Sequence, residues 1–212
     1  MSIAEPLILS VETATLSGSV ALSRGEVILA AFAGDSGVSH SNTLLNDIDK
    51  LLNEAHIDLS DVDLFAVATG PGSFTGLRIG IATVKALAAT LDRPCAGIPT
   101  LQAVALAAGE SHHSVALLPA GRGEVFAQLF SVTKDGFVTA LDQATHISPQ
   151  RLIEKYGSLE NVLWCGEKEL QGLVLARQIA SLALIKFRDK QLEQPDALQA
   201  IYVRPSDAEL KV

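Results

Sequence analysis

Residues 70–80 read Gly70-Pro-Gly-Ser-Phe-Thr-Gly-Leu-Arg-Ile-Gly80 and separate two apolar segments. The segment before them, Leu64–Thr69, is a short continuous apolar run, which is typical of a buried strand. The segment after them, Ile81–Leu91, carries apolar residues at helical spacing. Glycine and proline permit a sharp turn between the two, and Ser73 or Thr75 can cap a helix. The sequence therefore predicts a strand, a glycine-rich turn and a helix, in that order.

Because backbone N–H groups at a helix N-terminus attract anions, this turn could hold a phosphate. Its glycines match neither of the common phosphate-binding signatures. The third glycine of a dinucleotide fingerprint would fall at Thr75, and a Walker loop would need Lys and then Ser or Thr after Gly76. Nucleotide binding at this turn is thus an alternative interpretation rather than the favoured one.

The helix after the turn has two distinct faces. A ridge of mostly small residues recurs at three- and four-residue spacing and comprises Gly72, Gly76, Gly80, Thr83 and Leu87. An apolar stripe comprises Leu77, Ile81, Val84, Ala88 and Leu91. The stripe is enough to cover the helix's own sheet, so the ridge can admit another helix at short distance. Close packing within the same chain is the alternative, and both interpretations stay open.

The composition is that of a globular protein with a sizeable core. Of the 212 residues, 48% are apolar and 19% are charged, which suits one large domain or two of about 100 residues each. The net charge of −8 disfavours tight binding of nucleic-acid phosphates by this chain alone. We expect a cytoplasmic protein, because the sequence shows no basic signal start and no uncharged membrane-length run.

The order of the predicted elements indicates a mixed α/β fold. In the first half, strands are expected at 7–11, 18–22, 27–32, 64–69 and 96–98, and helices at 44–55, 77–91 and 100–108, with Ser39 or Ser41 capping the first helix. In the second half, strands are expected at 115–118, 125–132, 137–141, 162–165 and 200–203, and helices from Pro149, after Ser148, and over 174–187. The similar order in both halves predicts two lobes, residues 1–108 and 109–212, with a cleft between them. A single continuous sheet is the alternative.

Two turns between strands carry polar residues. Glu12, Thr13, Thr15 and Ser17 lie at the first turn, where a carboxylate and hydroxyls could meet a phosphate or a magnesium ion. Such residues also bond to their own backbone in ordinary hairpin turns, which is the competing interpretation. The segment 122–124, Arg-Gly-Glu, occupies the matching turn of the second half, and the same two interpretations, a ligand site or an ordinary hairpin turn, apply to it.

The sequence offers no hydrolase or metal site. Cys95 and Cys165 lack the spacing of a zinc or redox motif, so we expect buried free thiols. The five histidines form no helical pair of the kind that a zinc hydrolase uses, so exposed loop histidines are expected. No nucleophile-elbow motif surrounds any serine.

Two segments together resemble a known family. Ser10-Val-Glu-Thr-Ala-Thr15 and the stretch 70–80 closely resemble the TsaB (YeaZ) family, which takes part in making threonylcarbamoyladenosine in tRNA. Further landmarks of the resemblance are His40, Ile98–Leu101, Arg122–Val125 and Tyr202–Pro205.

The resemblance implies a fold and a role. The fold is two ribonuclease-H-like lobes of the actin, hexokinase and sugar-kinase (ASKHA) superfamily, with mixed sheets flanked by helices. The role is that of a non-catalytic subunit that pairs with the catalytic homologue TsaD, together with the ATPase TsaE, to modify adenosine 37 of tRNAs that read codons beginning with A. This chain alone would need no cofactor, while partners could supply ATP or ADP and a metal. It would meet tRNA only through the complex, and a homodimer is expected in isolation.

Two departures from the active relatives bear on nucleotide binding. Glu12 stands where the family usually has Asp, and the residues after it lack the glycine that admits a phosphate. Pro119 stands where the family commonly has Asp in the second lobe, and proline neither holds a metal nor donates an N–H. The first turn is therefore expected to be a vestigial phosphate turn.

The partner surface is expected on the helices 44–55 and 77–91. Its predicted residues are Leu44, Leu45, Ile48, Gly76, Arg78, Gly80, Thr83 and Leu87. Gly80→Arg is expected to abolish pairing with TsaD and keep the fold if this ridge is exposed, and to unfold the chain if the ridge is core. The competing functions are an autonomous ATP-dependent phosphotransferase of the same fold and, with least support, a peptidase.

Overall fold

The computed structural model describes residues 5–35, 37, 40–166 and 172–203, with no account of the side chains of residues 40–42. Contacts divide the chain into two compact units. The first contains the described parts of 1–69, 73–98 and 172–200, and the second contains those of 70–72, 99–171 and 201–212.

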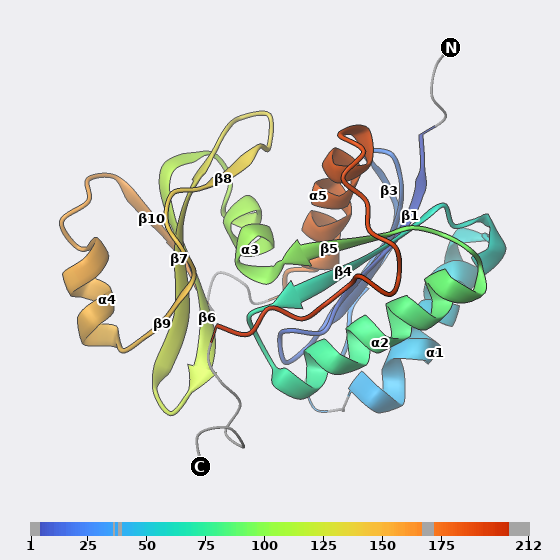
Figure 1. Ribbon diagram of the computed structural model, residues 1–212, viewed down its shortest axis with the longest axis horizontal. Helices are drawn as coiled ribbons and strands as arrows, with labels where there is room; N and C mark the ends of the chain where they lie inside the picture. Colours follow the sequence, from blue (N-terminus) through green and yellow to red (C-terminus); the bar gives the residue numbers. More distant parts are fainter. Residues whose placement is uncertain (1–4, 36, 38–39, 167–171, 204–212) are drawn as a thin grey trace. The chain divides into compact units, whose positions relative to one another are not determined.

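The first unit is built on a five-stranded mixed sheet (Figure 1). Its strands are β1 (Leu7–Glu12), β2 (Ser19–Arg24), β3 (Val27–Ala33), β4 (Leu64–Gly70) and β5 (Cys95–Pro99), in the order β3-β2-β1-β4-β5. β1 pairs with β2 in antiparallel and with β4 in parallel orientation. All residues of β1 and β4 are buried, because a parallel pair at the centre of a sheet is covered on both faces.

Helices cover both faces of this sheet (Figure 1). α1 (His40–Ala55) and α2 (Phe74–Thr90) lie on one face and contact each other, and α5 (Ala176–Arg188) packs against β1, β2 and β3 on the other. A short 3-10 helix, Leu59–Asp61, precedes β4.

The second unit holds a separate mixed sheet. Its strands are β6 (Ser111–Gly121), β7 (Glu124–Val132), β8 (Val138–Ala140), β9 (Thr145–Ile147) and β10 (Val162–Cys165), in the order β10-β6-β7-β8, with β9 also paired to β7. α3 (Thr100–Ala108) contacts β6, β7, β8 and β10, whereas α4 (Pro149–Tyr156) contacts β7. Figure 1 shows the two helices on opposite faces of the sheet.

Two sheets are present, so the prediction of two α/β lobes is confirmed and the single-sheet alternative is wrong. The units do not follow the predicted boundary between residues 108 and 109. α3 packs on the second sheet, and the segment 172–200 returns to the first sheet as α5 and the strap that follows it.

Local predictions were most accurate where a capping residue or a short apolar run marked the element. β10 has the predicted bounds, and Ser148 caps α4 by accepting a bond from the Arg151 amide, with Pro149 in the first turn. The strand expected at 200–203 is wrong, because the described residues there have no strand structure, and β9 was not predicted. Ser41 lies inside α1 rather than before it, and Ser39 lies outside the described residues.

Within the described part of the chain, none of the helices combines the length and the apolar character that crossing a membrane requires.

Candidate functional site: the first strand turn and the face of α1 and α2

The turn after β1 is organised around the Glu12 carboxylate. One oxygen, Oε1, accepts a 2.8 Å hydrogen bond from the Thr15 amide, and the other, Oε2, accepts a 2.8 Å bond from the Thr15 hydroxyl. Glu12 is buried at the end of β1. The Thr15 amide and hydroxyl, which could otherwise face a phosphate, are therefore bonded to a carboxyl group of the chain itself.

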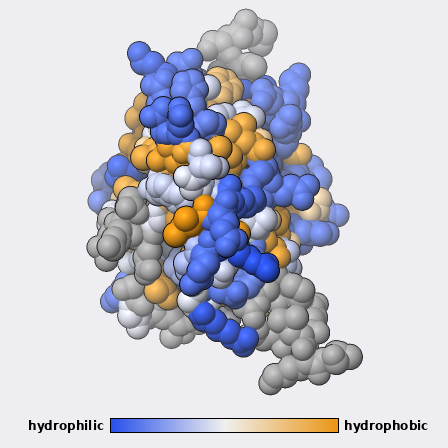
Figure 2. All heavy atoms as spheres, turned by 90° about the vertical axis from the view of Figure 1, so that its left-hand side faces the viewer, coloured by the Kyte–Doolittle hydropathy of each residue, from blue (hydrophilic) through white to orange (hydrophobic). Residues whose placement is uncertain are grey.

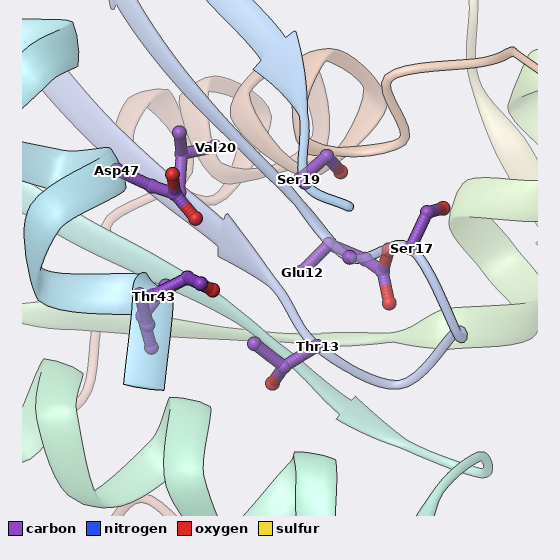
Figure 3. Close-up of a pocket in the computed structure, with 10 residues that line it drawn as sticks. Glu12, Thr13, Ser17, Ser19, Val20, Thr43 and Asp47 are labelled. Carbon is purple, nitrogen blue, oxygen red and sulfur yellow. The ribbon is translucent and has the colours of Figure 1, made fainter. Parts of the chain in front are cut away.

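A small pocket lies beside the turn (Figure 3). Glu12, Thr13 and Ser17 line one side, and Thr43 and Asp47 of α1 line the other. The cavity volume is about 10 Å³, which is the space of about one water molecule. Two carboxylates and this size disfavour a phosphate group. Among the described residues, no group of three or more His, Cys, Asp or Glu side chains is placed to hold a metal ion.

The same turn holds the N-terminus of α2. Ser73 caps the helix, since its hydroxyl accepts a 3.2 Å bond from the Gly76 amide. The Ser73 amide donates to the Ala14 carbonyl at 2.8 Å. The Thr13 hydroxyl, in turn, donates to the Gly76 carbonyl at 2.8 Å, within the buried interior. Two consecutive residues of the turn thus bond to two positions in the first turn of α2.

This contact explains the glycines of the ridge. A β-carbon at Gly76 would collide with the Thr13 carbonyl oxygen, and one at Gly80 would collide with the Thr13 hydroxyl. Both glycines are buried. The expectation of a free ridge for a partner helix is therefore corrected at Gly76 and Gly80, because Thr13 of the same unit fills that space.

The other predicted interface residues divide between core and surface. Leu44 and Ile48 are buried in the core cluster of the first unit, and Leu87 packs against that cluster. Leu45 on α1 is 63% exposed, and Arg78 on α2 is exposed. The surface part of the prediction therefore rests on Leu45 and Arg78, while Thr83 on α2 is half-buried.

The structure adds Phe74, which the sequence analysis did not select. It is the first residue of α2 and is 38% exposed, although it is aromatic. The Arg78 guanidinium lies 3.9 Å from the centre of its ring, which is a cation–π contact. The four-residue spacing of an aromatic residue and an arginine at a helix start is the signal that could have found this pair.

In the second unit, the 122–124 turn is a tight hairpin between β6 and β7. Arg122 has φ +54°, with Gly121 and Gly123 also at positive φ on either side. Glu124 lies 2.9 Å from the Nε2 atom of His146. His146 is half-buried in β9 and His113 is half-buried in β6. His112 also lies in β6 and His40 begins α1, so the expectation of exposed loop histidines is wrong for these four and fits His56.

Cys95 and Cys165 are free and buried, as predicted. Burial, aided by the nearby Glu193 carboxylate, raises the pKa of the Cys95 thiol to about 11.

Figure 2 shows hydrophobic residues scattered among hydrophilic ones on the face of the second unit that holds α4. Ile153 of α4 and Leu163 of β10 are exposed, and scattered residues of this kind mark no site by themselves.

Comparison with known proteins identifies the family. The family model described as "TsaD: tRNA N6-adenosine threonylcarbamoyltransferase" matches residues 35–177, which is more than half of the chain. The Bacillus subtilis protein TsaB, a tRNA threonylcarbamoyladenosine biosynthesis protein, is 32% identical over 126 residues, 58% of this chain and 54% of its own. This chain belongs to the TsaB/YeaZ family. Escherichia coli TsaB is 29% identical over 72% of this chain and 67% of its own, so the matches span about half to two thirds of these relatives.

Solved structures agree on the fold. A Pseudomonas aeruginosa protein described as similar to the peptidase YeaZ has a TM-score of 0.81, at 23% identity, and covers 94% of this chain and 100% of its own. An activator of 2-hydroxyisocaproyl-CoA dehydratase from Clostridium difficile, solved with bound ADPNP, has a TM-score of 0.51 at 12% identity over 92% of this chain and 99% of its own. The chain therefore shares the α/β fold of these solved structures, with two mixed sheets, as the resemblance implied.

Proposed function

We propose that this chain is a non-catalytic subunit that pairs with the catalytic homologue TsaD, and works with the ATPase TsaE, in forming threonylcarbamoyladenosine at adenosine 37 of tRNA. Membership of the TsaB/YeaZ family supports the tRNA modification, since the curated relatives are named for it. The net charge of −8 supports contact with tRNA through the complex rather than through this chain alone.

The observation that carries the non-catalytic role is the internal bonding of Glu12. Both carboxyl oxygens of Glu12 accept bonds from Thr15, so the Thr15 amide and hydroxyl are already used within the turn. A nucleotide phosphate would have to displace the buried Glu12 carboxyl group from these two donors. Pro119 lies within β6 and offers no carboxylate for a metal in the second unit. Any ATP, ADP or metal in the complex would on this proposal be held with the partners' help.

The partner surface is proposed on the exposed side of α1 and α2. Leu45 supplies an exposed apolar side chain on α1, and the stacked pair of Phe74 and Arg78 supplies an aromatic and a guanidinium group on α2. Aromatic residues and arginine are enriched among residues that dominate interface energy. In the absence of TsaD, the same face would join two copies of this chain in a homodimer.

The test compares two exposed apolar residues of the first unit. Leu45→Asp is expected to weaken TsaD binding by about tenfold or more, because an interface centre excludes water from a charged group. Val27→Asp is the matched control: Val27 is 65% exposed, on β3 and outside α1 and α2. Affinities are measured by titration calorimetry, with light scattering for the homodimer. Equal affinities of the two variants would place the interface elsewhere.

The alternative function, an autonomous phosphotransferase, has its support in the fold shared with the ADPNP-bound activator. Titration of the isolated chain with ATP and magnesium separates the two functions. Saturable micromolar binding with turnover would favour the phosphotransferase and contradict the scaffold proposal, whereas we expect neither.

A further inference from the structure

We infer that Thr13 is a positioning residue for the partner surface, because its hydroxyl fixes the first turns of α2, which carry Phe74 and Arg78. This inference rests on the function proposed above, since it concerns how the same surface is presented. On this inference, the turn after β1, which the resemblance implies to be a vestigial phosphate turn, orients a helix instead of a ligand.

The first step is the geometry of the hydroxyl. Thr13 is buried at the end of β1, and its Oγ1 donates to the Gly76 carbonyl at 2.8 Å. That carbonyl lies in the first turn of α2, and a carbonyl oxygen has two lone pairs, so the bond adds to the helix ladder without replacing it. The approach is possible because Gly80, one turn later, has no side chain where the Thr13 hydroxyl lies.

The second step is a bond on the other side of the same turn. The Ala14 carbonyl accepts from the Ser73 amide at 2.8 Å, at the cap of α2. The turn therefore holds α2 at residues 73 and 76. Phe74, which is partly exposed, lies between these two anchors, and Arg78 lies within a further turn and stacks on its ring. A rotation of the first turn of α2 would move both side chains, and the two bonds oppose that rotation.

The third step separates positioning from general stability. Ser10, on β1 and three residues before Thr13, also has a buried hydroxyl, which donates to the Ala21 carbonyl at 3.1 Å and to the Ala176 carbonyl at 2.8 Å. These bonds tie β1 to β2 and to α5, on the face of the sheet opposite α2. Loss of the Ser10 hydroxyl should therefore lower stability without turning α2.

The experiment uses three variants of the full chain. Thr13→Val keeps the shape and removes the donor, Thr13→Ser keeps the donor, and Ser10→Ala is the control for stability. Each is measured for TsaD affinity by calorimetry, for thermal stability, and for hydrogen exchange of the amides in 74–80.

Thr13→Val is expected to lose exchange protection in 74–80 and to bind TsaD up to about fivefold more weakly. Without the bond, a smaller fraction of the free chain would hold α2 in the binding orientation, and about fivefold is the full value of one net hydrogen bond. Thr13→Ser is expected to restore both measurements to within about twofold of wild type, since it keeps the bond. Ser10→Ala is expected to lower the melting temperature while protection in 74–80 and TsaD affinity stay at wild-type values.

The inference is overturned if Thr13→Val keeps wild-type protection in 74–80 while folded, or if Ser10→Ala weakens TsaD binding as much as Thr13→Val does. Failure of the wild-type chain to bind TsaD would contradict the proposed function instead. In that case the exchange measurements still decide whether Thr13 positions α2.

Discussion

Gly80→Ala is expected to lower the free energy of unfolding, although alanine is the better helix former. The gain in helix propensity is about 1 kcal/mol. Against it, a β-carbon at this position would collide with the Thr13 hydroxyl in a buried contact, and overpacking of this kind costs about 1–3 kcal/mol. Displacing the hydroxyl from the Gly76 carbonyl would add about 1–3 kcal/mol for the unpaired group. The net expectation is a loss of about 1–5 kcal/mol.

The assay is urea unfolding followed by circular dichroism, in the wild-type and Thr13→Ala backgrounds. In the second background the colliding hydroxyl is gone, and the new β-carbon would lie 3.4 Å from Cβ of residue 13, which is ordinary contact. Gly80→Ala should then be neutral or stabilising. Gly76→Ala is the matched control, because its β-carbon would meet the backbone oxygen of residue 13, which Thr13→Ala leaves in place.

The reasoning is refuted if Gly80→Ala is neutral in the wild-type background, or if it costs the same in both backgrounds. The same geometry revises the expectation for Gly80→Arg. An arginine cannot fit where Thr13 lies, so this variant should unfold the first unit rather than remain folded and unpaired.

Two further predictions concern residues of α5 and β5 that contact the segment following α5. Lys186→Met should lower the free energy of unfolding by about 1 kcal/mol, because the Lys186 ammonium donates to the Gly97 carbonyl at 2.8 Å and to Glu193 at 3.4 Å. The control is Lys190→Met, at an exposed position. Equal losses of the two variants in urea unfolding would contradict a stabilising role of the Lys186 bonds. For Cys95, the pKa is raised from 9.0 to about 11, so the folded state favours the neutral thiol. Its contribution to stability should be complete below pH 9 and decline as the pH rises toward 11, and Cys95→Ala should flatten this decline; an unchanged pH profile would contradict it.

The bounds of helices and strands could be predicted from the sequence better than the packing of these elements against one another. The bounds of β10 and the start of α4 could be read from an apolar run and from a Ser-Pro cap. That α3 packs on the second sheet could not be read, since helical periodicity does not say which sheet a helix covers. β9 could not be predicted, because Thr145-His-Ile147 is only three residues long and contains no apolar run.

The candidate site shows the same division. Spacing alone identified the ridge of Gly76 and Gly80, yet it could not identify the occupant, because Thr13 lies 63 residues away from Gly76 in the sequence. The self-bonded turn was one of two open interpretations, and the bonds from Thr15 to Glu12 favour it. Phe74 was missed because an aromatic residue near a helix start reads as core unless its exposure is known.

The central claim is that this chain acts in tRNA modification only through its partners. The most direct measurement is reconstitution of threonylcarbamoyladenosine formation from purified TsaD, TsaE, tRNA and threonylcarbamoyl donor, with this chain added, omitted or tested alone, and the nucleoside quantified by mass spectrometry. The account predicts modification when this chain, TsaD and TsaE are all present, a large loss when this chain is omitted, and none from this chain alone. Equal modification with and without this chain, or modification by this chain without TsaD, would contradict it.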